Sequence, residues 1–171
     1  MREIRELIHP VPDFPSKGIV FRDITPLLLE PAALQEVVDV LAERYGGRGI
    51  DCVAAIESRG FIFGAPLALA LGAGLAPVRK LGKLPRETRS REYQLEYGSN
   101  HLEMHLDSVA RGERVLIVDD VLATGGTARA TVDIVEELGG TVVGVAFLIE
   151  IAALGGRSRL HGREPFALLE F

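Results

Sequence analysis

The sequence predicts a single α/β domain in which helices flank a twisted, mostly parallel sheet. Segments with helical periodicity alternate with short apolar runs along the chain. Several of these runs are apolar throughout, as expected for strands that are buried on both faces of a parallel sheet. With 171 residues, the chain has the length of one domain with a substantial core. The prediction is therefore one domain over residues 1–171.

The central part of the chain predicts the elements one after another. A helix begins near Pro31, a residue favoured in the first turn, and ends at Gly46-Gly47. The run over 102–106 alternates apolar and polar residues, which is typical of a half-exposed strand. Residues 1–30 and 152–171 are expected to form flanking or hood elements. The remaining predicted elements are helices over 61–71 and 127–138 and strands over 52–56, 75–78, 115–118 and 141–149.

Composition excludes several classes of protein. The formal net charge of −5 argues against general nucleic-acid binding. No stretch is long and apolar enough to span a bilayer, and the first residues lack the hydrophobic region of a signal peptide. The single cysteine, Cys52, excludes an internal disulfide, and its apolar surroundings favour a buried core residue over a reactive thiol. These features predict a cytoplasmic enzyme.

Positive charge is concentrated in one segment of this acidic chain. Residues 79–91 contain six basic residues and only one acidic residue, Glu87. Such a run is most often a solvated loop. This one, however, follows a predicted buried strand, where ligand loops of open α/β sheets emerge. Its field would attract a polyanionic substrate such as pyrophosphate.

The most informative run covers residues 115–127. Four apolar residues are followed by Asp119 and Asp120, and then by a loop of small residues that leads into the helix predicted over 127–138. Glycines let a backbone approach a ligand closely, and the unpaired N–H groups of a helix N-terminus suit a phosphate. The two carboxylates would not favour that phosphate, so they would bind hydroxyl groups or a cation. A phosphate beside a polyol indicates a sugar phosphate.

Commoner phosphate loops do not fit this run. A Walker A loop requires a lysine after its last glycine, but Thr127 follows Gly126 directly, and the dinucleotide spacing G-x-G-x-x-G is absent from the chain. The alternative is a tight turn preceded by two surface aspartates. That alternative is disfavoured because adjacent acids directly after a buried strand are costly unless they bind something.

Residues 115–127 resemble the phosphoribosyl pyrophosphate signature of the type I phosphoribosyltransferases. Further segments resemble the adenine-specific members of that family, in register from about Pro12 to about Ile151; they cover residues 12–15, 18–26, 57–64, 79–85 and 93–98. The resemblance implies the type I phosphoribosyltransferase fold, with a small N-terminal hood over 1–30 and a mobile catalytic loop over 80–98. It also implies a purine-salvage glycosyltransferase. Such an enzyme transfers the 5-phosphoribosyl group from phosphoribosyl pyrophosphate to adenine, giving AMP and pyrophosphate.

The resemblance assigns the ribose end of the substrate to residues 119–127. Asp119 and Asp120 are expected to bind the 2- and 3-hydroxyls and to stabilise positive charge that develops on the ring. They would reach Mg²⁺ directly or through water, and we expect the ion to arrive bound to the substrate. The residues implied for the 5-phosphate, mainly through backbone N–H groups, are Ala123, Thr124, Gly125, Gly126 and Thr127.

For the pyrophosphate leaving group the resemblance implies Arg59 together with the backbone amides of Ser58 and Gly60. It also implies a non-proline cis peptide at Glu57–Ser58. The other cationic candidates are Arg79, Lys80 and Lys83, some of which would reach a neighbouring subunit in a dimer. A solvated mobile loop is the preferred interpretation for Arg86, Arg89 and Arg91.

The resemblance implies a base pocket at the N-terminal segment. Phe21 would stack on one face of adenine, main-chain groups of Val20 and Arg22 would read its edge, and Ile151 would close the other face. Without the flanking motif, Phe21 would be interpreted as an ordinary core aromatic. Glu96 would act as the general base that removes the N9 proton, within a closing loop that also contains Tyr97.

Two alternatives stay open at this stage. The first is a phosphoribosyltransferase for another base, such as xanthine or orotate. The second is a non-catalytic phosphoribosyl pyrophosphate sensor that binds DNA, although this chain has no spare length for a DNA-binding module. A homodimer is expected from the resemblance. The apolar helix over 61–71 fits a dimer interface and the core of the domain equally well.

Overall fold

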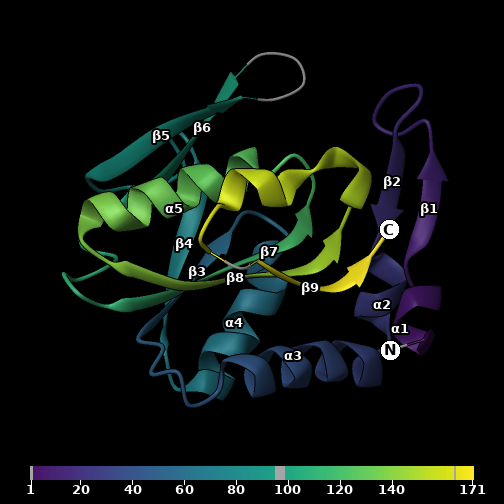
Figure 1. Cartoon of the computed structure of the whole chain (residues 1–171), viewed down its shortest axis with the longest axis horizontal. Coiled ribbons are helices and arrows are strands. Elements are labelled where there is room, and N and C mark those ends of the chain that lie inside the picture. The colour runs from purple at the N-terminus through teal and green to yellow at the C-terminus, as the bar shows by residue number, and fades with distance from the viewer. Residues whose placement is uncertain (1, 95–98, 164) are drawn as a thin grey trace.

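The computed structural model describes residues 2–94, 99–163 and 165–171 and has the predicted α/β architecture (Figure 1). Within these residues the main sheet has the order β5-β6-β4-β3-β7-β8-β9. The neighbours from β4 to β9 pair in parallel, whereas β5 and β6 pair antiparallel at one edge. The strands of this sheet are β3 (Cys52–Ile56), β4 (Gly74–Lys80), β5 (Thr88–Gln94), β6 (Ser99–His105), β7 (Arg114–Leu122), β8 (Thr141–Glu150) and β9 (Phe166–Glu170).

Helices cover both faces of the sheet, as Figure 1 shows. The helices α3 (Pro31–Tyr45) and α4 (Gly60–Leu71) share one buried apolar cluster, and α5 (Gly126–Leu138) contributes to the cluster on the other face. Successive residues of β7 enter opposite clusters: Leu116 and Val118 lie on the α4 side, and Val115 and Ile117 lie on the α5 side. The continuous apolar runs are therefore buried on both faces, as the sequence predicts.

The strand order places a ligand site between β3 and β7. From β3 the chain continues to β4 on one side, while β7 lies on the other side of β3 and leads on to β8. The connections that leave the carboxyl ends of β3 and β7 therefore diverge in opposite directions. In open α/β sheets, ligands bind in the crevice outside such a switch point.

Two predictions about the basic segment and its neighbour are wrong. Arg89 and Arg91 do not lie in a solvated loop, because they belong to β5, which pairs with β6, and both make ion pairs with Glu137 of α5. Nor is β6 half-exposed, since Leu102 to His105 are all buried. Glu103 tolerates burial because its carboxylate accepts hydrogen bonds from backbone and hydroxyl groups of the preceding segment.

The flanking segments fold into elements that the sequence did not resolve. At the N-terminal end, β1 and β2 form a separate two-stranded antiparallel sheet, which lies near the C-terminus in Figure 1. At the C-terminal end, β9 extends the main sheet. The flanking elements are α1 (Arg2–Glu6), β1 (His9–Pro12), β2 (Val20–Asp23), α2 (Thr25–Leu29), and the 3₁₀ helices η1 (Ala152–Leu154) and η2 (Gly156–Leu160).

Two expectations about single features can also be compared with the structure. Cys52 is buried in β3, and burial raises the pKa of its thiol to about 11, as expected for an unreactive core residue. Of the described helices, none combines the length and the apolar character that a membrane crossing requires.

Candidate active site

Two adjacent cavities open at the carboxyl ends of β3 and β7. One, of about 380 Å³, is lined by polar residues that include Asp119, Asp120 and Lys80. The other, of about 370 Å³, is mostly apolar and lies between β2 and the segment that follows β8. Arg59, Val121 and Ala123 line both cavities. The two cavities are therefore halves of one site that meet at these residues.

The paired carboxylates lie in the last part of β7, at the floor of the polar cavity. Asp119 and Asp120 are 9% and 4% exposed. Asp119 Oδ1 accepts a hydrogen bond of 2.8 Å from the Asp120 N–H, and Asp120 Oδ2 lies 2.8 Å from Arg59 Nε. Burial raises the pKa of both carboxyls, and the neighbouring charge of Asp120 raises that of Asp119 further, whereas Arg59 opposes the rise at Asp120.

The loop between β7 and α5 forms a small phosphate-sized cradle. Asp119, Ala123, Thr124, Gly125 and Thr127 are among the residues around a cavity of about 50 Å³. Gly125 is the N-cap of α5 with φ of +79°, a conformation that glycine adopts readily. No side chain caps this helix and its first turn contains no acidic residue. The N–H groups of the helix start are therefore available to an anion.

The turn after β3 brings Arg59 against the carboxylates. Ser58 follows a cis peptide bond at Glu57–Ser58, as the resemblance implied. A Cβ atom on Gly60 would lie only 2.9 Å from the Val118 carbonyl oxygen and 3.1 Å from Asp119 Oδ1. Glycine at position 60 therefore lets this turn lie directly against β7 and places Arg59 beside Asp120.

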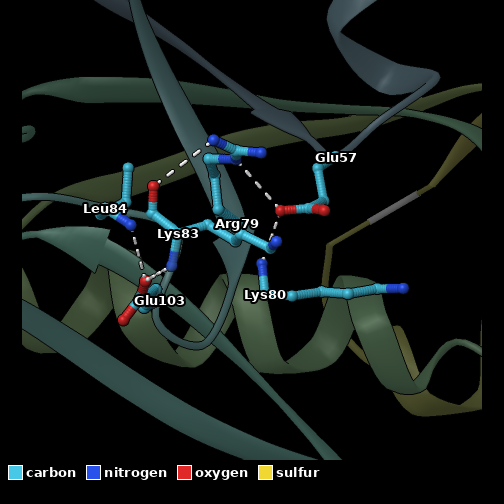
Figure 2. A network of polar contacts seen from close by, with 6 residues as sticks. All are labelled: Glu57, Arg79, Lys80, Lys83, Leu84 and Glu103. Carbon is cyan, nitrogen blue, oxygen red and sulfur yellow. Dashed lines mark hydrogen bonds and ion pairs between the residues drawn. The ribbon is translucent and has the colours of Figure 1, made fainter.

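The basic candidates after β4 divide into two groups (Figure 2). Glu57 accepts hydrogen bonds from Arg79 Nε at 3.1 Å and from the Lys80 N–H at 2.7 Å. Glu103 accepts a hydrogen bond from the Lys83 N–H. The Lys80 side chain extends away from this network and lines the polar cavity. The structure thus brings Lys80 to the site, whereas Arg79 and Lys83 are not among the residues that line either cavity.

All four residues expected to bind the base line the apolar cavity. Val20, Phe21 and Arg22 come from β2, and Ile151 follows β8. The Arg59 guanidinium carbon lies 4.9 Å from the centroid of the Phe21 ring. The face of this ring is therefore covered by a cation in the present structure.

Sequence reasoning missed several residues of the site. Tyr93 of β5 is 9% exposed, lines the polar cavity and shares a hydrogen bond with the Thr127 side chain. Gly156 packs against the cradle, and Glu57 orders the end of β4. Glu57 and Tyr93 lie in segments that carry the resemblance but were given no role there, whereas Gly156 lies in no such segment. Glu96 and Tyr97 lie outside the described residues.

The residues present suit a metal ion only in partnership with a substrate. Across residues 2–94, 99–163 and 165–171, no group of three or more His, Cys, Asp and Glu side chains could hold a metal. Asp120 Oδ2 is buried without a hydrogen-bond partner in this part of the chain, although it makes the ion pair with Arg59. The two carboxylates fit a Mg²⁺ ion that takes its remaining ligands from substrate phosphates and water.

Comparisons with known proteins agree with the geometry. The family model described as "Phosphoribosyl transferase domain" matches residues 24–165. The adenine phosphoribosyltransferase of Geobacter metallireducens is 55% identical over 171 residues, covering 100% of both chains. The crystal structure of the enzyme of that name from Thermoanaerobacter pseudethanolicus has a TM-score of 0.97, with 52% identity and 99% of each chain covered. The protein of that name from Saccharomyces cerevisiae has a TM-score of 0.93 and 42% identity, with 98% of this chain and 97% of that chain covered.

The matched residues include both the β3–α4 turn and the β7–α5 loop, and the relatives that match over the whole chain also cover Val20, Phe21 and Arg22 of the apolar cavity. The identities are far above the level at which only the fold is shared, and they extend over whole chains. The chain belongs to the phosphoribosyltransferase family and, within it, to the adenine phosphoribosyltransferases.

Proposed function

We propose that the two cavities form one active site that transfers the 5-phosphoribosyl group from phosphoribosyl pyrophosphate to adenine, giving AMP and pyrophosphate. The observation that carries this proposal is the meeting of a polar and an apolar cavity at Arg59, Val121 and Ala123. A sugar in the polar cavity and a base in the apolar one would face each other at this border. Binding both in that geometry makes the transfer effectively unimolecular.

The ribose would lie over Asp119 and Asp120, with its 5-phosphate at Ala123, Thr124, Gly125, Gly126 and Thr127. Breaking the bond between C1 and the pyrophosphate builds positive charge on the ring, as in glycoside cleavage. Two carboxylates fixed in a buried position stabilise that charge without further reorganisation. Because both carboxylates are buried and poorly solvated, they would interact more favourably with a cationic transition state than with a neutral sugar.

The leaving pyrophosphate would be bound by Arg59, the amides of Ser58 and Gly60, and Lys80. Arg59 contacts both Asp120 and the ring of Phe21. An anion near Arg59 would draw the guanidinium off this ring and free it to stack on adenine. Arg79 and Lys83 are proposed to assist through the positive field of the segment.

Adenine would stack on Phe21, with main-chain groups of Val20 and Arg22 at its edge and Ile151 on its other face. Glu96 is proposed as the general base for the N9 proton, and Tyr97 as part of the same closing loop. Residues 80–98 would close over the bound substrates and exclude water, which would otherwise hydrolyse the activated sugar.

Mg²⁺ is proposed as a substrate-bound cofactor, held by pyrophosphate and ribose hydroxyls and by Asp119 and Asp120, either directly or through water. The ion would neutralise part of the charge on the leaving group. The support from this chain is the pair of buried carboxylates of Asp119 and Asp120.

Relatives support the choice of ligands. The Saccharomyces cerevisiae protein was crystallised with an imino-altritol bisphosphate and adenine. The Trypanosoma brucei adenine phosphoribosyl transferase, 26% identical to this chain over 99% of it and 78% of that chain with a TM-score of 0.89, was crystallised with AMP, pyrophosphate and ribose-5-phosphate. We also propose that the protein acts in purine salvage in the cytoplasm and that it is a homodimer. Each chain would form a single domain over 1–171 with a hood over 1–30.

A glycine substitution tests the proposed cradle. Gly125→Ala would place a Cβ atom 2.5 Å from the Gly156 carbonyl oxygen at a φ of +79°. The loop must shift, so kcat/KM for phosphoribosyl pyrophosphate should fall by about tenfold or more. Gly112→Ala is the matched control, because Gly112 has a φ of +86° and nothing within 4 Å of the added Cβ. Equal initial rates for both variants would contradict the placement of the 5-phosphate.

A further inference from the structure

Six consecutive residues after β8 connect the two halves of the proposed site. We call residues 151–156, which lie between Glu150 and Arg157, the 151–156 bridge. Ile151 and Leu154 line the apolar cavity at one end of this bridge. Gly156 touches the β7–α5 loop at the other end. The position of the bridge therefore affects both the base pocket and the cradle.

The contact between the bridge and the cradle is backbone against backbone. A Cβ atom on Gly156 would lie 2.2 Å from the Ala123 carbonyl oxygen and 3.1 Å from Gly125 N. From the other side, a Cβ atom on Gly125 would lie 2.5 Å from the Gly156 carbonyl oxygen. Apart from the Leu122 side chain, whose Cδ1 lies 2.9 Å from the Cβ position of Gly156, the nearest atoms are backbone of the cradle, so a shift of Gly156 must shift the loop.

An ion pair joins the two residues that flank the bridge. Glu150, which is 4% exposed, accepts hydrogen bonds of 2.7 Å from Arg157 Nε at both carboxylate oxygens, and Arg157 Nη2 lies 2.6 Å from Oε2. Arg157 Nη1 also donates a hydrogen bond of 2.6 Å to the Pro165 carbonyl oxygen. A guanidinium held by several charge-assisted bonds has a defined orientation.

Glu150 is itself fixed to the strand that precedes the cradle. It pairs in register with Leu122 of β7, and the Ile151 N–H donates a hydrogen bond of 2.9 Å to the Leu122 carbonyl oxygen. These contacts form a closed ring. It runs from Leu122 along the 123–127 loop to Gly156, then through Arg157 and its ion pair to Glu150, and back to Leu122 through the strand pairing. The ion pair is the side-chain link of this ring.

We propose that Glu150 and Arg157 are positioning residues that hold the 151–156 bridge, so that the base pocket and the 5-phosphate cradle keep a fixed separation. The inference rests on the function proposed above. A ligand that occupies both halves at once, such as AMP, binds more tightly when this separation is fixed, because the protein loses less conformational freedom on binding. Adenine or ribose 5-phosphate alone, which occupies one half, gains little.

A stabilising role alone would look different. Removing Arg157, whose side chain is 48% exposed, would leave the charge of the buried Glu150 uncompensated, which destabilises the fold whether or not the pair acts on the site. Thermal stability therefore does not separate the two roles. The affinity for AMP relative to its two fragments does, when it is measured well below the melting temperature.

The test compares Arg157→Met and Glu150→Gln with the control Arg163→Met. Arg163 pairs with Glu136 of α5 and lines neither cavity of the site. Glu150→Gln keeps an oxygen that accepts a hydrogen bond from Arg157. It is therefore the milder variant, to be used if Arg157→Met does not fold. Calorimetric titration would give the dissociation constants of AMP, adenine and ribose 5-phosphate, and kcat and KM would be measured alongside.

We expect Arg157→Met to weaken AMP binding by about tenfold or more and each fragment by less than about threefold. Arg157→Lys should recover part of this loss, and adding Glu150→Gln to Arg157→Met should cost little more, because the pair acts as a unit. A lowered melting temperature with unchanged AMP affinity, or a loss equal to that of Arg163→Met, would overturn the proposal. Failure of the unmodified protein to bind AMP would instead overturn the proposed function.

Discussion

Asp119 and Asp120 show how much the position of a residue in the sequence can predict about its role. Their place after a buried strand predicted a task for both carboxylates, and the structure places them at the floor of the polar cavity. The ion pair between Arg59 and Asp120 was not predictable, since it depends on how closely the β3–α4 turn approaches β7. That approach is a tertiary property, and only the absence of a Cβ atom at Gly60 permits it.

Asp119→Asn should separate activity from stability. The raised pKa of Asp119 means that the folded state holds a proton which the unfolded chain releases, so stability is lost as pH rises through that pKa. At pH 7 the neutral amide should therefore raise the Tm by about 2–4 °C, which corresponds to roughly 1 kcal/mol for a chain of this size. The same change should lower kcat about 100-fold, because it removes the charge that is proposed to stabilise the transition state. Calorimetry and initial rates measure the two effects; a stable variant with full kcat would contradict the assigned role.

The pH dependence of activity should reflect the same buried pair. Both carboxyls must be ionised to stabilise a cationic ring, and burial raises both of their pKa values. The acidic limb of kcat/KM should therefore lie above the range of an ordinary aspartate, which is about 3.9. Arg59 opposes the rise at Asp120, so Arg59→Met should move this limb to higher pH. An acidic limb that Arg59→Met leaves unmoved would contradict the coupling.

At the scale of elements, the segment over 79–91 shows where sequence reasoning failed. A solvated loop was the preferred interpretation for Arg86, Arg89 and Arg91, but β5 pairs along β6, and Arg89 and Arg91 bind Glu137 of α5. Long side chains with charged ends occur in loops and on edge strands alike, so charge alone does not distinguish them. By contrast, α3 and β3 occupy the predicted ranges because their apolar periodicity and the glycines after α3 agree.

Glu137→Gln should loosen the β5–β6 hairpin from α5. Both ion pairs are partly exposed, so their loss should change kcat/KM by only about two- to fivefold, in line with about 1 kcal/mol or less. The effect should vanish at high salt, where surface charges are screened. Glu136→Gln is the neighbouring control, because Glu136 pairs with Arg163 instead. Equal effects of the two substitutions would show that the hairpin contact plays no part.

At the scale of the whole molecule, α4 has an unusual surface. This helix has no polar or charged side chain, yet Leu69 is 84% exposed and Ile62 and Leu75 nearby are 38% and 42% exposed. Exposed apolar residues on a uniformly apolar helix fit the proposed interface between two copies of this chain. The sequence predicted the helix but left its partner open between core and interface, because periodicity cannot say what covers a uniformly apolar helix.

Leu69→Lys should therefore shift the proposed homodimer toward the monomer. A charge at the centre of an apolar interface is desolvated without a partner, which weakens association strongly. Light scattering after size-exclusion chromatography would show the mass halved, and circular dichroism would confirm that the variant is folded. A monomeric unmodified protein, or a variant that stays dimeric, would contradict the proposal.

In the proposed reaction, one site transfers the phosphoribosyl group of phosphoribosyl pyrophosphate to adenine and releases pyrophosphate. The most direct test offers phosphoribosyl pyrophosphate and Mg²⁺ with adenine, hypoxanthine, xanthine, guanine or orotate in separate reactions and measures nucleotide and pyrophosphate. We expect AMP and pyrophosphate in equal amounts from adenine and little product from the other bases. No AMP from adenine, or a faster reaction with another base, would contradict it.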